Sequence, residues 1–373
     1  MITHFTLHQL FARAALSAGA LFGWVMFFAI HLEAVSSLPL AIMHTGVAYA
    51  LSQIVLVLFV PLAGRLYAQG VVRVMILAML ALAAALVSHA LLMGGETNPF
   101  TVLGFAFGMG VYRALYATPF ALVQHDMHEE RYWFDIALAY IPLLVGLLLT
   151  QGVVGEPMIL IAAALCAFCA IVPLAQFEAY ERYEWGYRET FGMLLEPAHR
   201  RFVLESLVRG VEGAALFFAW PLFVFIILGQ SYLALGLVFS VSAFLLLALR
   251  VAAPERPIIT TPLMAATVTS ASWLARIVAV GPLAVIGIQL ASSAAHPRRI
   301  HEHVVADHFA DGGTFLDELT TLKELALGMG RLVFACAFFA ALYYLPIAWA
   351  LGFIFVLAAL AGGAASYLAH GKH

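Results

Sequence analysis

The sequence predicts an all-α integral membrane protein, and three observations carry this prediction. Of 373 residues, 64% are hydrophobic and only 10% are charged, against about 25% charged residues in a soluble domain. Apolar runs recur along the whole chain, and about 20 such residues cross a hydrocarbon core as a helix. The run 75–92 is apolar at nearly every position, without the alternation of a transmembrane β-strand. Lipid is therefore the expected solvent for most of the chain.

Glycine, proline and charged residues divide the chain into about twelve apolar segments of helical length. In the first half the expected helices are 12–32, 41–66, 71–93, 99–122, 133–154 and 156–175. In the second half they are 201–228, 231–249, 258–278, 281–297, 319–344 and 347–369. Only Gly281 and Pro282 divide 258–297, so one span plus a re-entrant piece stays open there, with eleven spans in all.

The distribution of arginine predicts the orientation of the chain, because cytoplasmic loops collect lysine and arginine. Loop arginines fall in alternate loops, namely at Arg65, Arg73, Arg131, Arg182, Arg188, Arg200, Arg201, Arg250, Arg256, Arg298 and Arg299. The opposite loops contain no lysine or arginine; Arg276, near the outer end of the ninth helix, fits poorly. We therefore expect both termini to be cytoplasmic, and the lack of a targeting segment favours a prokaryotic plasma (inner) membrane.

The longest central polar stretch divides the chain into two halves. We expect an N-terminal six-helix bundle over 1–176, a cytoplasmic linker over 177–200 and a C-terminal six-helix bundle over 201–373. Aromatic residues recur at helical spacing among the charges of the linker, which predicts an amphipathic helix at the headgroups. A simple linker with incidental aromatics remains the alternative.

Two six-helix halves, cytoplasmic termini and a central cytoplasmic loop resemble the major facilitator superfamily (MFS) of transporters. The family's loop between helices two and three reads roughly G-x-L-x-D-R-x-G-R-R, and residues 64–73 read GRLYAQGVVR. The resemblance maps a cytoplasmic gating loop onto Gly64, Arg65, Gly70 and Arg73. The second glycine stands one residue early and the acidic residue is missing, so the charge relay of that motif is not carried over.

The seventh helix contains the densest group of ionisable residues inside a span. Glu205, Arg209 and Glu212 follow at i, i+4 and i+7, which places them on one helix face. An ionisable residue deep in a membrane helix is a functional candidate by default. Because the seventh helix resembles a cavity-lining helix of the family, we expect Arg209 to bind a solute or a carboxylate, and Glu205 or Glu212 to exchange a proton. A static salt-bridged cluster is the alternative.

Two further arginines lie deep in predicted spans. Arg113 follows Tyr112 in the fourth helix, and Arg331 ends the run Gly328–Arg331 in the eleventh. Together with Arg209 they favour an anionic or zwitterionic solute over a cation. Either side chain could instead reach the cytoplasmic surface along its aliphatic stem.

Three polar residues gather at the outer ends of the first two helices. His31 and Glu33 end the first helix and His44 opens the second, so they predict an outer gate or a proton entry point, since histidine titrates near neutral pH. Polar side chains that simply anchor helix ends are the other interpretation.

Two predicted cytoplasmic loops are rich in histidine and acid. The first covers 125–130, and the second includes His301, His303, Asp307 and His308. Imidazole and carboxylate groups can bind a divalent metal, although solvated loops that avoid lysine explain them too. A membrane di-iron oxygenase would need adjacent histidine pairs, which this chain lacks, and we do not expect an enzyme.

These features predict a secondary active transporter that moves a small organic solute, anionic or zwitterionic, by alternating access with proton coupling. The alternatives are a lipid or amphiphile flippase of the same fold and a non-transporting membrane scaffold or assembly factor. The expected partners are the solute, protons and the lipid bilayer. No cofactor, resident metal or nucleic acid is expected, and the protein is expected to be a monomer.

Overall fold

The computed structural model describes residues 4–67, 69–96, 98–125, 132–152, 154–176, 185–252, 261–295 and 316–370. Within these ranges nearly every residue is helical and there is no β-strand. The predicted all-α class is therefore confirmed.

Six long helices and one short helix form the first half, and a further short helix, α8, lies in the linker. They are α1 His4–Val35, α2 Leu38–Tyr67, α3 Val71–Met93, α4 Pro99–His125, α5 Tyr132–Thr150, α6 Glu156–Cys169, α7 Ile171–Leu174 and α8 Tyr187–Met193. Helix α1 begins before residue 12 because Phe5 and His8 are buried against the bundle. The sixth segment breaks into α6 and α7 just before Pro173, whose missing N–H cannot continue the helical bonds.

The second half contains α9 Arg200–Ala214, α10 Trp220–Ile227, α11 Tyr232–Ala252, α12 Pro262–Ala275, α13 Gly281–Ala295, α15 Leu316–Tyr344 and α16 Ile347–His370. A π-helical turn, η2 (Ala215–Ala219), joins α9 directly to α10, and 3₁₀ turns η1 (Pro197–His199) and η3 (Arg276–Val278) flank α9 and α12. Pro221 follows the π turn, and such bulges relieve a break in the helical hydrogen-bond ladder.

The chain is an integral membrane protein by the length and surface of its helices. Among the described residues, nine helical segments are long and apolar enough to span a bilayer, and 134–150 and 281–292 are shorter apolar helices. Large apolar side chains point outward along them, for example Leu165 and Leu360. A count of about twelve spans stays a prediction, as does the nature of 258–297, where α12 and α13 are both short.

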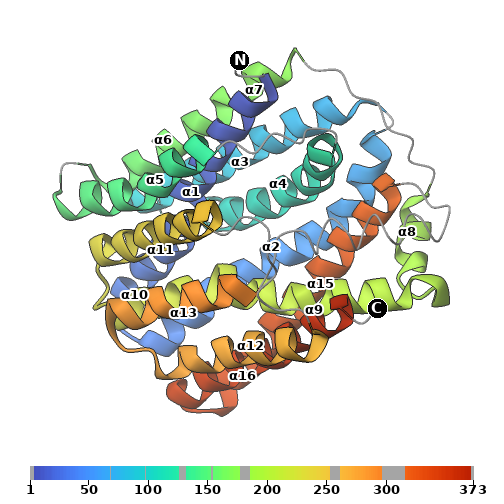
Figure 1. Cartoon of the computed structure of the whole chain (residues 1–373). Coiled ribbons are helices and arrows are strands. Elements are labelled where there is room, and N and C mark those ends of the chain that lie inside the picture. Colours follow the sequence, from blue (N-terminus) through green and yellow to red (C-terminus); the bar gives the residue numbers. More distant parts are fainter. Residues whose placement is uncertain are drawn as a thin grey trace.

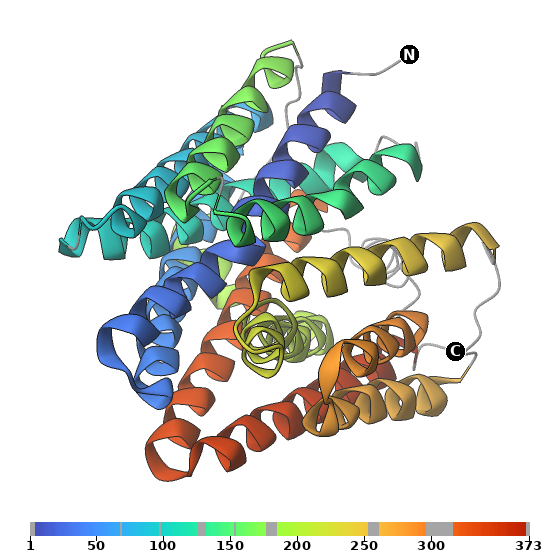
Figure 2. The same ribbon diagram turned by 90° about the vertical axis from the view of Figure 1, so that its left-hand side faces the viewer.

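The two halves of the chain lie side by side (Figure 1). In Figure 2 the helices α3 to α7 gather in the upper part and α11, α12, α13 and α16 in the lower part, with both chain ends on the right-hand side. Below, the side that holds the chain ends is named the terminal side, and the side of the α1–α2 turn is named the far side.

Two helix pairs make the most extensive contacts between the halves. Helix α2 packs along α15, and α5 packs along α11. Gly328 of α15 leaves room for the Leu56 side chain, while Gly146 and Gly236 let the backbones of α5 and α11 approach closely. Small residues allow such close packing of helices in lipid, where no hydrophobic force drives association.

The α5–α11 contact also supplies a hydrogen bond where a proline interrupts the ladder of α5. Pro142 interrupts the helical bonds of α5, and the backbone N–H of the next residue, Leu143, donates to Ser240 Oγ of α11 at 2.9 Å. A side chain of the second half thereby satisfies a backbone group of the first half.

Candidate functional site

The predicted α9 cluster contains a buried ion pair. Arg209 Nη2 lies 2.9 Å from Glu205 Oε1, and Arg209 Nε donates to the same oxygen at 3.0 Å. The two side chains are only 12% and 6% exposed, so the pair is largely removed from water. One helical turn separates the residues, and local helix geometry therefore brings them together.

The third member of that predicted cluster, Glu212, has a different partner. Its Oε1 accepts a hydrogen bond of 2.9 Å from Trp273 Nε1 of α12. A Cβ on Gly362 of α16 would collide with the same carboxylate. Glu212 therefore lies between α9, α12 and α16, inside the second half.

Arg276, which fitted the loop-charge pattern poorly, explains the position of Glu212. Its guanidinium is 1% exposed and lies 3.6 Å from the centre of the Trp273 ring and 4.9 Å from that of Trp220. Nη2 donates to Ser292 Oγ of α13 at 3.3 Å, and Glu212 acts on the cation electrostatically. The ring faces and the carboxylate together stabilise a charge that lipid alone would exclude.

The predicted residues Arg113 and Arg331 lie within electrostatic reach of each other, on helices of different halves. Both act electrostatically on the hydroxyl of Tyr49 in α2, and they act on each other. Arg113 lies near the middle of α4 and Arg331 near the middle of α15. Arg331 is buried, and its Nε has no hydrogen-bond partner among the described residues. Glu324, two turns earlier in α15, also acts on Arg331.

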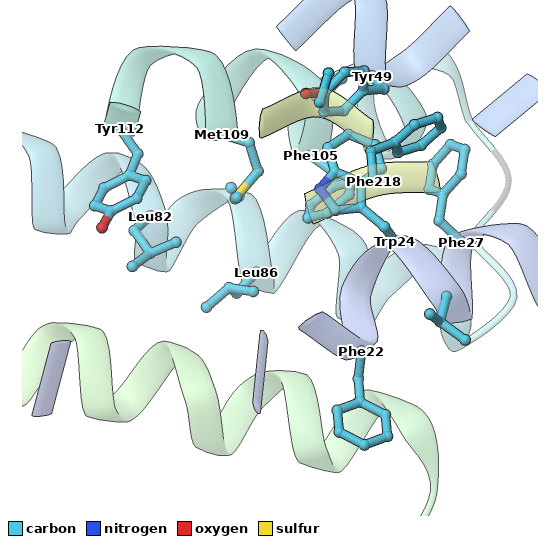
Figure 3. Close-up of a cluster of buried hydrophobic side chains, with 14 of the residues drawn as sticks. Phe22, Trp24, Phe27, Tyr49, Leu82, Leu86, Phe105, Met109, Tyr112 and Phe218 are labelled. Atoms are coloured by element: carbon cyan, nitrogen blue, oxygen red, sulfur yellow. The ribbon is translucent and has the colours of Figure 1, made fainter. Parts of the chain in front are cut away.

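An aromatic cluster from both halves encloses one side of this arginine pair. Tyr49 stacks on Phe218 of the π turn with ring centres 4.2 Å apart, and Trp24 of α1 meets both rings edge-on. Phe105 of α4 packs against Trp24 at 4.9 Å. Figure 3 shows these four residues close together, with Phe27 beside them.

Tyr112, the neighbour of Arg113, belongs to a separate stack within the first half. Its ring lies 5.2 Å from that of Tyr116, whose hydroxyl is 3.0 Å from His8 Nε2. His8 Nδ1 lies 2.8 Å from the carbonyl oxygen of Ala170. A carbonyl only accepts, so Nδ1 carries the hydrogen and the Tyr116 hydroxyl donates to Nε2. The fully buried His8 is thus held on both nitrogens.

The predicted outer gate lies on the far side of the molecule. The rings of His31 and His44 are 5.4 Å apart, whereas Glu33 is exposed and acts on Tyr232 of α11 instead. A third histidine, His89 of α3, is fully buried nearby and acts electrostatically with His31. Sequence reasoning missed it, although a histidine inside an apolar run is itself a signal.

The predicted gating loop lies at the turn between α2 and α3. Gly64 and Gly70 are buried, and Arg65 and Arg73 are exposed. Gly70 has φ of +123°, a conformation that favours glycine. The Arg65 guanidinium lies beside Gly186, where α8 begins, so this turn contacts the linker between the halves.

Several predictions fall outside the described residues. His301, His303, Asp307 and His308 do, as do 126–130 and linker residues 177–184. The described part of the linker contains the short helix α8 and the 3₁₀ turn η1. Within the described ranges, no three histidine, cysteine or acidic residues are grouped so that they could bind a metal ion.

The fold matches solved transporters over nearly its whole length. The crystal structure of a D-xylose-proton symporter has a TM-score of 0.59 at 14% identity, covering 95% of this chain and 96% of that one. The nucleoside transporter NupG has a TM-score of 0.58 at 13% identity, covering 98% and 99%, and a mutant of it has 0.61 at 10% identity. No family model matches the sequence, and a comparison with curated proteins found no match.

These structural matches define the fold of the molecule. The chain shares the fold of these solved membrane transporters over nearly its whole length. At 10% to 14% identity the matches establish the fold alone, and function has to be argued from the chain's own residues.

Proposed function

We propose that this protein is a secondary transporter that moves a small organic anion or zwitterion across the membrane by alternating access, coupled to protons. The observation that carries the proposal is the convergence of Arg113 and Arg331 on Tyr49, between the two halves. Arg331 is buried and Arg113 is partly buried, and two neighbouring cations with little water around them are unfavourable unless an anion joins them. A bound carboxylate or phosphate would supply that charge.

The surroundings of the arginine pair favour an organic rather than an inorganic anion. Tyr49, Phe218 and Trp24 form an aromatic wall next to it, and apolar walls with a few polar groups are typical of small-molecule sites. Glu324 also acts on Arg331, so the positive charge is partly balanced. That balance is compatible with a zwitterion as well as with a monoanion.

Alternating access would use the two contacts between the halves. Helices α2 and α15, and α5 and α11, approach closely at glycine residues, and such smooth surfaces allow the halves to rock around a site at their interface. Two six-helix domains, 1–176 and 201–373, joined by the linker 177–200, are the bodies that would move. We propose twelve spans, a terminal side that faces the cytoplasm of a prokaryotic cell, and a monomeric protein.

The first experiment is ligand binding by the purified full-length protein in detergent. Thermal unfolding is followed with a panel of small carboxylates, phosphate esters, amino acids, neutral sugars and nucleosides. A ligand at 100 times its Kd raises the unfolding free energy by about 2.7 kcal/mol. Stabilisation by an anion or zwitterion that disappears in Arg331→Gln and Arg113→Gln is the expected result. Arg188→Gln, on exposed α8, is the matched control.

Transport is then measured as counterflow of the labelled ligand in vesicles, with and without a pH gradient. Stabilisation by neutral solutes alone, unaffected by Arg331→Gln, would refute the anion assignment. Movement of a labelled lipid analogue without any soluble ligand would favour the flippase. A protein that binds no solute, and that moves neither a solute nor the lipid analogue, would favour the scaffold.

A further inference from the structure

Three histidines on the far side are progressively more buried from the surface inward. His44 of α2 is exposed, His31 of α1 is partly buried, and His89 of α3 is 0% exposed. All three lie near the helix ends at Val35, Leu38 and Met93. They therefore form a series that runs from the surface of that side into the interior of the first half.

His89 is unusual because neither of its ring nitrogens has a hydrogen-bond partner among the described residues. Phe105 meets its ring edge-on at 4.3 Å and Phe27 at 5.7 Å. A neutral imidazole has one donor and one acceptor, and leaving both without a partner in the interior is unfavourable. By comparison, the equally buried His8 is held on both nitrogens.

The ring of Phe27 contacts both inner histidines. It stacks on His31 at 4.4 Å and also contacts His89. His31 Nδ1 donates to the Phe27 carbonyl oxygen at 2.7 Å, which leaves His31 Nε2 as the nitrogen with a free lone pair. His31 can therefore take a proton on Nε2 from the His44 side and release it from the same atom.

We propose that His44, His31 and His89 form a proton path from the far side, that Phe27 gates it, and that His89 is its terminal proton acceptor. Each relay imidazole gains and loses one proton, and no bond other than N–H forms or breaks. His89 then holds the proton as an imidazolium with two donors and no acceptor. That state requires the surrounding rings to rearrange, because a buried charge without a partner costs several kcal/mol.

Most of the helices that pack against α3 also carry ionisable residues, which a charge on His89 would face. Helices α1, α2, α4, α6 and α7 pack against α3, and among their described residues His31 is the titratable neighbour that acts on His89. Glu33, His44 and Glu156 lie at the same end of α1, α2 and α6, Arg113 lies two turns beyond Phe105 in α4, and α7 has no titratable residue.

Aromatic contacts lead from His89 to the interface between the halves. Phe105 contacts His89 and Trp24, and Trp24 contacts Tyr49 and Phe218. A rearrangement around a protonated His89 would therefore reach the stack of Tyr49 on Phe218. This coupling role rests on the proposed proton-coupled transport, whereas the proton path itself does not.

The path is tested without any substrate by hydrogen–deuterium exchange at the Cε1 atom of each histidine, read by peptide mass spectrometry. Full-length protein in nanodiscs is compared from about pH 5 to about pH 9, the range that brackets histidine titration. We expect His89 to exchange at least about tenfold faster than His8, which corresponds to about 1.4 kcal/mol easier local opening. Phe27→Ala should accelerate His89, and His31→Phe should slow it to the rate of His8.

Global unfolding would accelerate His8 as well, so His8 reports whether each variant is folded. The proton path is refuted if His89 is as slow as His8 in both the wild type and Phe27→Ala, or if His31→Phe leaves its rate unchanged.

Coupling is tested separately in vesicles. His89→Gln should lose solute-driven proton movement by on the order of 10²-fold while it retains solute counterflow, and His8→Gln should retain both. Normal proton movement in His89→Gln refutes its coupling role. Wild-type vesicles without counterflow of any solute refute the proposed function instead, and the exchange experiment still decides the path.

Discussion

Trp273 donates a hydrogen bond of 2.9 Å from Nε1 to Glu212 Oε1, and the face of the same indole lies 3.6 Å from the guanidinium of Arg276. One side chain therefore connects the carboxylate of α9 to a buried cation of the second half. The arrangement gives Glu212 a role in stabilising Arg276 in addition to any part in transport.

The first prediction concerns this charge pair. Glu212→Gln keeps an oxygen that can accept from Trp273 but removes the negative charge next to Arg276. Because breaking a buried charge pair leaves one ion unpaired, we expect a loss of about 3 kcal/mol, measured by thermal unfolding in detergent. The double variant Glu212→Gln, Arg276→Met should recover part of the loss. If the single variant unfolds like the wild type, Arg276 does not depend on Glu212.

The second prediction concerns the ion pair of α9. Glu205→Ala and Arg209→Ala should each destabilise the protein, and the double variant should lose less than the sum of the two. A hydrogen bond to a charged group contributes about 1.5–3 kcal/mol, so the double-mutant cycle should give a coupling energy in this range. Additive losses would mean that the pair contributes nothing beyond two independent side chains.

The third prediction concerns the contact between α9 and α15. A Cβ on Gly210 would collide with the carbonyl oxygen of Leu327, and a Cβ on Gly330 with that of Leu207. Gly210→Ala and Gly330→Ala should therefore push the two helices apart and lose about 1–3 kcal/mol, as overpacking does.

Gly213 supplies the matched control on the same helix, because a Cβ there meets nothing within 4 Å. Gly213→Ala should be neutral or stabilise α9 by up to about 1 kcal/mol through helix propensity. Equal effects of the alanine substitutions at 210 and 213, measured by thermal unfolding, would show that the close approach does not determine stability.

The fourth prediction separates structure from binding at Tyr49. Tyr49→Phe preserves the stack on Phe218 but removes the hydroxyl on which Arg113 and Arg331 act. We expect an unchanged unfolding temperature and roughly tenfold weaker binding of the anion found in the panel, since one hydrogen bond contributes about 1 kcal/mol or somewhat more. Titration monitored by thermal shift measures both quantities.

Phe218→Ala is the complementary variant. It removes a buried ring from the interface of the halves and should lose about 3–5 kcal/mol of stability. Wild-type affinity in Tyr49→Phe would place the anion away from the tyrosine, and full stability in Phe218→Ala would show that the stack does not hold the halves together.

The helices could be predicted well because the solvent dictates them. Each predicted apolar range contains a helix in the described residues, and those of 71–93 and 347–369 agree nearly residue by residue. The ends of helices were harder to predict where packing against other helices determines them. Phe5 and His8 extend α1 because they are buried by contacts from elsewhere in the chain, which no local pattern in residues 4–11 reveals.

Local spacing also brought one part of the candidate site together. Glu205 and Arg209 are four residues apart, so helix geometry alone makes them neighbours. Glu212 shows the limit of this argument. It lies three residues beyond Arg209, yet it bonds to a tryptophan of α12 and acts on the buried Arg276.

The sequence by itself determined that this is an all-helical membrane protein, because apolar runs of about 20 residues can satisfy their backbone in lipid only as helices. Only the tertiary structure decided which polar groups meet. Arg113 and Arg331, Glu212 and Arg276, and His31 and His89 come near enough to act on each other electrostatically. These pairings depend on how far each helix is rotated about its own axis, and long-range contacts such as that of Gly210 with Gly330 fix this rotation where composition leaves it open.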